Sequence, residues 1–145
     1  MCSSRPGSGT VHDMKDFAGA MPARDRLSKE DIESIEFAVR HERELRAPDV
    51  AAVVTHRLFD CMLDQNTREN HRWLDRGIAP TDWVGWNRYA PPLGEGCRCT
   101  LIGITHARAR KMIESGEGFD LTQRVPEGAG PDEGWTRSEG WWDSL

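Results

Sequence analysis

Residues 91–99 read Pro-Pro-Leu-Gly-Glu-Gly-Cys-Arg-Cys, so two thiols directly follow a proline- and glycine-rich turn. Upstream, residues 64–71 read Asp-Gln-Asn-Thr-Arg-Glu-Asn-His and end in an imidazole. Short loops of this composition are ordered by metal ligands or by side-chain hydrogen bonds. We therefore expect the two segments to meet in the fold and to pin down the loop between them.

The sequence after this turn predicts a strand and then a helix. Residues 99–104 are apolar and rich in β-branched side chains, which is typical of a strand. Thr105 is placed to cap a helix that runs to about Ser115 and ends at Gly116.

The sequence before the polar block predicts a helical hairpin over residues 28–62. Ser28 is the expected N-cap of the first helix, and Pro48 is expected to end it. A second helix is predicted over residues 49–62, because apolar residues recur there at helical spacing. These residues are Val50, Val53, Val54, Leu58, Cys61 and Met62.

Together these elements predict a small α+β domain with extended terminal arms. We expect a flexible or extended arm over residues 1–26 and a core domain over residues 27–116. The core comprises the hairpin at 28–62, an irregular motif-bearing loop at 63–99, and the strand and helix at 100–116. Residues 117–145 are expected to form an extended tail rich in tryptophan and glycine.

Composition restricts the function. The chain has 145 residues and a net charge of −5, which argues against strong general affinity for nucleic acid. No apolar run approaches the roughly 20 residues that span a bilayer, and no signal-peptide core is visible. We therefore expect no membrane partner and synthesis in a cytoplasm, where the four cysteines (positions 2, 61, 97 and 99) are free thiols or metal ligands.

Three interpretations of the Cys/His residues stay open. In the first, Cys61, His71, Cys97 and Cys99 bind a structural zinc ion, because thiolate and imidazole together favour zinc. In the second, hydrogen bonds and packing hold the motif without metal, with Asp64 accepting from backbone N–H groups or pairing with an arginine.

The third interpretation is catalytic. One possible site has Cys97 as nucleophile, with His71 as base and Asp64 orienting it. Another is a metal-dependent nuclease site that uses Asp64, His71 and Asn87. The spacing matches no nucleophile elbow, and we expect no enzymatic activity.

The tail carries three tryptophans among polar residues and glycines. Trp135, Trp141 and Trp142 are therefore predicted to bind a partner surface, since exposed aromatic side chains are typical of interfaces.

The spaced motif resembles the Mu F-like minor head protein family of tailed bacteriophages. The matching residues are Asp64, Thr67, Arg68, His71, Leu74, Asp75, Gly77, Trp83, Pro91, Pro92, Gly94, Cys97, Arg98 and Cys99. Many members carry a Cys-x-x-Cys pair where this chain has Arg68-Glu-Asn-His71.

The resemblance implies a minor structural protein of the virion that acts in head morphogenesis. It implies portal or connector and capsid proteins as partners, packaged DNA as a further one, and a place in the head or head–tail connector. The alternatives are a zinc-stabilised module that binds nucleic acid, and a metal-dependent nuclease or phage-borne effector. The resemblance also implies a structural motif of Asp64, Thr67, Arg68, His71, Cys97, Arg98 and Cys99.

Overall fold

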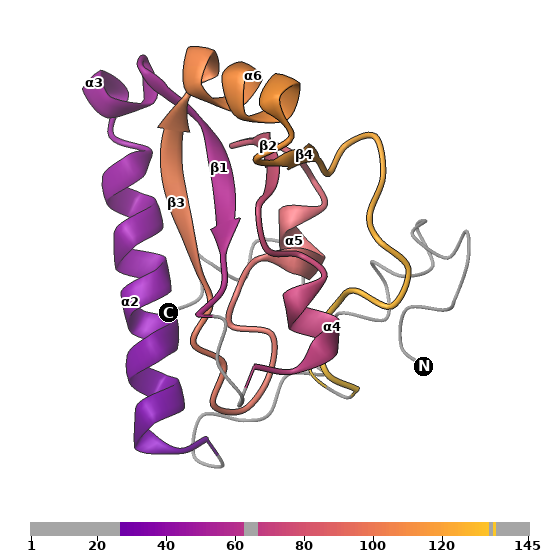
Figure 1. Cartoon of the computed structure of the whole chain (residues 1–145). Coiled ribbons are helices and arrows are strands. Elements are labelled where there is room, and N and C mark those ends of the chain that lie inside the picture. The colour runs from indigo at the N-terminus through magenta and orange to yellow at the C-terminus, as the bar shows by residue number, and fades with distance from the viewer. Residues whose placement is uncertain (1–26, 63–66, 134, 136–145) are drawn as a thin grey trace.

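A mixed four-stranded sheet lies at the centre of the computed structural model, which describes residues 27–62, 67–133 and 135 (Figure 1). The strand order is β3-β1-β2-β4. β1 pairs antiparallel with β2 and β3, whereas β2 pairs parallel with β4. The strands are β1 (Val54–Asp60), β2 (Gly77–Pro80), β3 (Thr100–Thr105) and β4 (Phe119–Asp120). The predicted α+β class is confirmed.

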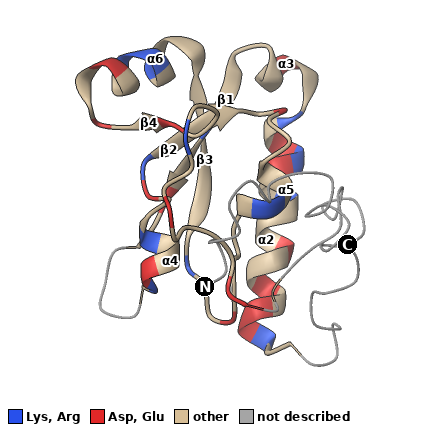
Figure 2. Cartoon of the chain, turned by 90° about the vertical axis from the view of Figure 1, so that its right-hand side faces the viewer, with Lys and Arg blue, Asp and Glu red and all other residues tan. Residues whose placement is uncertain are grey.

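The first predicted helix is present as α2 (Lys29–Leu45), which runs alongside the sheet (Figure 1). Ser28 caps it, and its side-chain oxygen accepts a hydrogen bond from the Asp31 N–H at 3.0 Å. Ile35 and Val39 face the interior, whereas charged residues of both signs lie along the helix (Figure 2). The expected cap is therefore confirmed.

The prediction of a second helix over residues 49–62 is wrong. A single turn, α3 (Pro48–Ala51), is followed by the strand β1, which carries Thr, Leu and Phe at its centre. β1 is an inner strand that is buried on both faces. Leu58 packs on one face against Ala109 and Met112 of the helix that follows β3, and Phe59 lies on the other face in the main core. Apolar residues on both faces produced helical spacing by coincidence, so periodicity alone could not separate strand from helix.

The motif loop and the tail contain more regular structure than predicted. Within 63–99 lie α4 (Glu69–Arg72), β2 and α5 (Trp86–Tyr89). The tail does not begin as a separate arm at residue 117, because β4 pairs with β2 and Leu121 and Ala129 are buried in the main core. These segments are too short to show periodicity, and they gain their order from tertiary packing.

The predicted strand and helix over residues 100–116 are confirmed as β3 and α6 (His106–Ser115). Thr105 accepts from the Arg108 N–H at 3.1 Å, and Gly116 ends the helix with a φ of 86°. α6 packs across one end of the sheet through Ala109 and Met112 (Figure 1). The opposite end of the sheet carries the Cys/His residues.

No helix within the described ranges is long and apolar enough to span a membrane. The expected flexible arm, residues 1–26, lies outside the described residues.

A buried ion pair fastens α2 to the sheet. Arg57 of β1 has a side chain only 1% exposed, and its Nε donates to Glu42 Oε1 at 3.0 Å. The Arg57 Nη2 also donates to Glu42 Oε2 at 3.1 Å, so the guanidinium is held by two bonds. Arg46 pairs with the same carboxylate from the exposed side of the helix.

We predict that Glu42→Ala lowers the free energy of unfolding by about 3–5 kcal/mol, because it leaves the buried Arg57 charge without its partner. Urea denaturation followed by circular dichroism measures this loss. Glu44→Ala, at a side chain 70% exposed on the same helix, is the matched control and should change stability by less than about 1 kcal/mol. Equal losses in both variants would contradict the assignment.

Candidate metal centre

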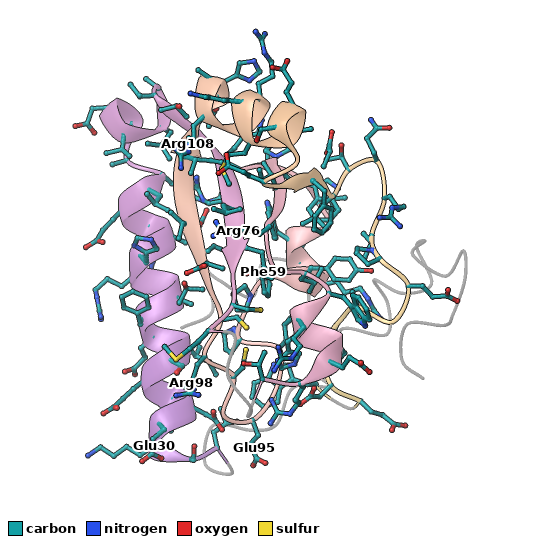
Figure 3. All side chains as sticks on the ribbon, in the orientation of Figure 1. Glu30, Phe59, Arg76, Glu95, Arg98 and Arg108 are labelled. Carbon is teal, nitrogen blue, oxygen red and sulfur yellow. The ribbon has the colours of Figure 1, made fainter. Side chains whose placement is uncertain are left out.

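The structure brings the four predicted ligands together from three parts of the chain. Cys61 directly follows β1, His71 lies in α4, and Cys97 and Cys99 precede β3. All four are buried, and the exposed fraction ranges from 1% for His71 to 8% for Cys99. Figure 3 places Glu95 and Arg98, which flank Cys97, at the same end of the molecule as Glu30 at the start of α2.

The ligand atoms lie close enough to share one ion. One nitrogen of His71 and the sulfurs of Cys97 and Cys99 all lie within 4.8 Å of one another. The Cys61 sulfur lies 2.9 Å from the Cys99 sulfur and also contacts the His71 carbonyl oxygen at 3.2 Å. Three cysteines and one histidine are a standard donor set of closed, tetrahedral structural zinc sites.

The sulfur positions also show what binding would require. A tetrahedral zinc ion with bonds of about 2.3 Å separates two sulfurs by about 3.8 Å. The Cys61 and Cys99 sulfurs would therefore move apart from 2.9 Å. His71, Cys97 and Cys99 therefore fit a zinc ion in ligand type, and Cys61 lies beside Cys99 as a candidate fourth ligand.

In the metal-free arrangement the thiols hold their protons strongly. The hydrogen bond to Cys99, and then burial, raise the pKa of Cys97 from 9.0 to about 12, although His71 opposes the shift. The hydrogen bond to Cys61 is the largest cause that raises the pKa of Cys99 from 9.0 to about 12. A metal ion that binds here must displace these protons, so binding depends on pH.

His71 is held by a residue that the sequence did not single out. Asp132 Oδ1 lies 3.0 Å from His71 Nε2, across 61 positions of the chain. The same carboxylate receives Asn70 Nδ2 at 3.0 Å and Arg68 Nε at 3.3 Å. Nothing in the local sequence around Asp132 marks it as a partner of His71, because only the folded chain brings them together.

The turn at 91–99 is shaped by its two glycines and by the buried Asp31 of α2. Gly96 has a φ of 72°, a conformation that favours glycine, and its N–H donates to Asp31 Oδ1 of α2 at 2.7 Å. A Cβ at Gly94 would come within 2.0 Å of Asp132 Oδ2, so only glycine fits there. Asp31, 2% exposed, thus links the cysteine turn to the start of α2.

The other residues of the predicted motif have structural contacts where they are described. Thr67 donates to the Met62 carbonyl oxygen, and Arg68 donates to the Glu95 carbonyl oxygen as well as pairing with Asp132. Arg98 is exposed between the two buried cysteines. Asp64 lies outside the described residues, so its predicted contacts are not part of the site shown.

Trp135, predicted to bind a partner, is instead part of the fold. Its side chain is 5% exposed, packs against Ile35 and Val39 of α2, and donates from Nε1 to the Pro92 carbonyl oxygen at 3.0 Å. The prediction for this residue was wrong because the apolar stripe of α2 supplies a surface within the chain. Trp141 and Trp142 lie outside the described residues.

Two cavities adjoin the cluster. The larger, of about 450 Å³, is lined by Cys97 and Cys99 on the side of α2. The smaller, of about 10 Å³, adjoins His71, Cys97 and Cys99 and has room for roughly one water molecule. Buried ligands without an open coordination position are typical of structural metal sites rather than catalytic ones. The predicted Asn87 of a nuclease site lies in α5, outside the residues that line this cavity.

Comparison with known proteins gives one informative match. The chain is similar to a phage protein. It is 30% identical over 78 residues to "Putative capsid assembly protein F" of Escherichia phage Mu, which covers 52% of this chain. The match spans only 17% of the Mu protein. No family model matches the chain, and no solved structure matches it.

We predict that the metal-free fold loses stability as the pH rises above 9. The unfolded chain ionises its thiols near 9.0, whereas the folded chain holds those of Cys97 and Cys99 protonated toward 12, so deprotonation favours the unfolded state. Urea titrations between pH 8 and about 10.5, with chelator and reductant, measure this slope.

The Cys97→Ser/Cys99→Ser variant is the control, because other groups also titrate in this range. Its free energy of unfolding should fall less steeply with pH. The same slope in both proteins would show that the two thiols ionise normally in the fold.

Proposed function

We propose that this protein is a minor structural protein of a phage head and that it acts in head assembly by binding capsid or portal subunits. The observation that carries the proposal is the 78-residue similarity to the Mu protein named for capsid assembly.

The form of the Cys/His cluster supports a binding role over an enzymatic one. Its side chains are buried and contact one another and Asp132, and the cavity that His71 shares with Cys97 and Cys99 has room for roughly one water molecule. We propose no catalytic activity for this site.

Exposed apolar side chains offer contact area for a protein partner. Phe37 on α2 is 45% exposed and lines a cavity of about 450 Å³ together with Pro91, Pro92 and Leu101. The charge of −5 makes packaged DNA a weaker candidate partner than a protein surface.

The head-assembly role is tested with particles of the virus that encodes the chain. Mass spectrometry of purified heads should detect the protein at far fewer copies than the major capsid protein. Deletion of its gene should reduce the yield of filled heads, and the intact gene supplied in trans should restore it. A protein absent from both heads and assembly intermediates would contradict the role.

A contact variant makes the binding claim specific. Phe37→Asp should weaken co-purification with the portal or capsid subunit, because it places a charge on the exposed apolar surface. Ile113→Asp, at a residue 36% exposed on α6, is the matched control and should bind as the natural chain does. Equal binding by all three proteins would place the interface elsewhere.

We further propose that Cys61, His71, Cys97 and Cys99 bind one structural zinc ion. The donor set supports this second claim, since the ligand atoms of His71, Cys97 and Cys99 lie within 4.8 Å of one another and the Cys61 sulfur lies 2.9 Å from that of Cys99. Zinc would join the end of β1, α4 and the turn before β3.

Metal analysis of the purified protein tests the zinc site. We expect one zinc per chain, and its loss in His71→Ala and Cys97→Ser. Cys2→Ser removes a cysteine outside the proposed set and should keep the metal. Protein that remains free of zinc after refolding with excess zinc under reducing conditions would contradict the site.

A further inference from the structure

The described residues of segment 129–135, which are 129–133 and 135, are attached at both ends to structures already described. At one end, the Gly130 N–H donates to the Asn70 carbonyl oxygen at 3.1 Å, and Asn70 Nδ2 donates back to the Gly130 carbonyl oxygen at 2.8 Å. At the other end, Trp135 is buried against Ile35 and Val39 of α2. Asp132 lies between the two ends and contacts His71.

The hydrogen bond from His71 to Asp132 sets which imidazole nitrogen is free. An ionised carboxylate only accepts hydrogen bonds, so Nε2 carries the proton and donates to Asp132 Oδ1 at 3.0 Å. Nδ1 is then unprotonated and available as a ligand. A carboxylate in this position also makes the histidine a stronger metal ligand.

Asp132 is itself held in place by the chain around it. Its N–H donates to the Leu93 carbonyl oxygen at 2.8 Å, and its carboxylate receives Asn70 and Arg68. Gly94 leaves no room for a side chain at this contact. Asp132 therefore touches His71 and the cysteine turn at once.

We propose that Asp132 is a positioning residue for the metal centre and that metal binding and the seating of Trp135 against α2 are coupled, so that a bound ion further stabilises a contact already present in the metal-free arrangement. The inference rests on the proposed zinc site. A bound ion holds His71, His71 orients Asp132, and Asp132 joins the segment to residues 93 and 94. The coupling is reciprocal. If zinc increases the equilibrium constant for seating Trp135 by some factor, then seating Trp135 increases the affinity for zinc by the same factor.

Zinc affinity tests the first half of the inference. Asp132→Ala should lower the affinity by about 10- to 100-fold, as measured by competition with a chromophoric chelator. Asp132→Asn should lose less, because the amide oxygen can still accept from Nε2. Glu133→Gln, at the exposed neighbour, is the matched control and should bind zinc as the natural chain does.

The environment of Trp135 tests the second half. In the full chain labelled with 5-fluorotryptophan, Trp135→Phe identifies the fluorine resonance of Trp135. We expect that resonance to shift toward its solvent-exposed position when zinc is removed from the natural chain. In Asp132→Ala it should be shifted even with saturating zinc, a change that reduced affinity alone would not produce.

The outcomes separate this inference from the zinc site itself. A natural chain that binds no zinc overturns both. Zinc binding of unchanged affinity in Asp132→Ala, or a Trp135 resonance identical with and without zinc, overturns the coupling and leaves the zinc site in place. If Asp132→Ala fails to fold by circular dichroism, Asp132→Asn carries the comparison, and affinity and Trp135 resonance equal to those of the natural chain would overturn the inference.

Discussion

Three parts of the chain that lack strong local order converge on one buried cluster of sulfur and imidazole. The end of β1, the single turn of α4 and the turn before β3 each contribute to it. A four-residue helix and a proline- and glycine-rich turn have too few internal hydrogen bonds to hold their shape alone. Their geometry depends on contacts between them, and the cluster is where those contacts meet.

The turn at 91–99 shows this dependence most clearly. It is held from outside by three side chains far away in sequence: Asp31 binds the Gly96 N–H, Arg68 binds the Glu95 carbonyl oxygen, and Asp132 packs on Gly94. Each tether comes from a different segment. The geometry of the turn therefore depends on contacts with α2, with the start of α4 and with Asp132.

The sequence predicted those elements whose signals are local. α2, β3 and α6 are marked by capping residues, a β-branched run and a terminal glycine, and all three were expected within a residue or two. β1 was missed because an inner strand buried on both faces has no alternation, so Val53, Val54 and Leu58 imitated a helix. Cys61 was nevertheless expected in the ligand set, because residue type and not secondary structure suggested it.

What the sequence could not supply was the environment of the ligands. Asp132 is 61 residues from His71, and a lone aspartate in a polar tail has many ordinary explanations. Trp135 was expected on a partner surface because nothing local showed that Ile35 and Val39 would cover it. The two errors have one cause, since both residues belong to a segment whose order comes only from distant contacts.

That segment joins the buried Cys/His cluster to α2, and α2 is in turn fixed to β1 by Glu42 and Arg57. The cluster is therefore connected to the helix that carries the exposed Phe37 both through this segment and through β1.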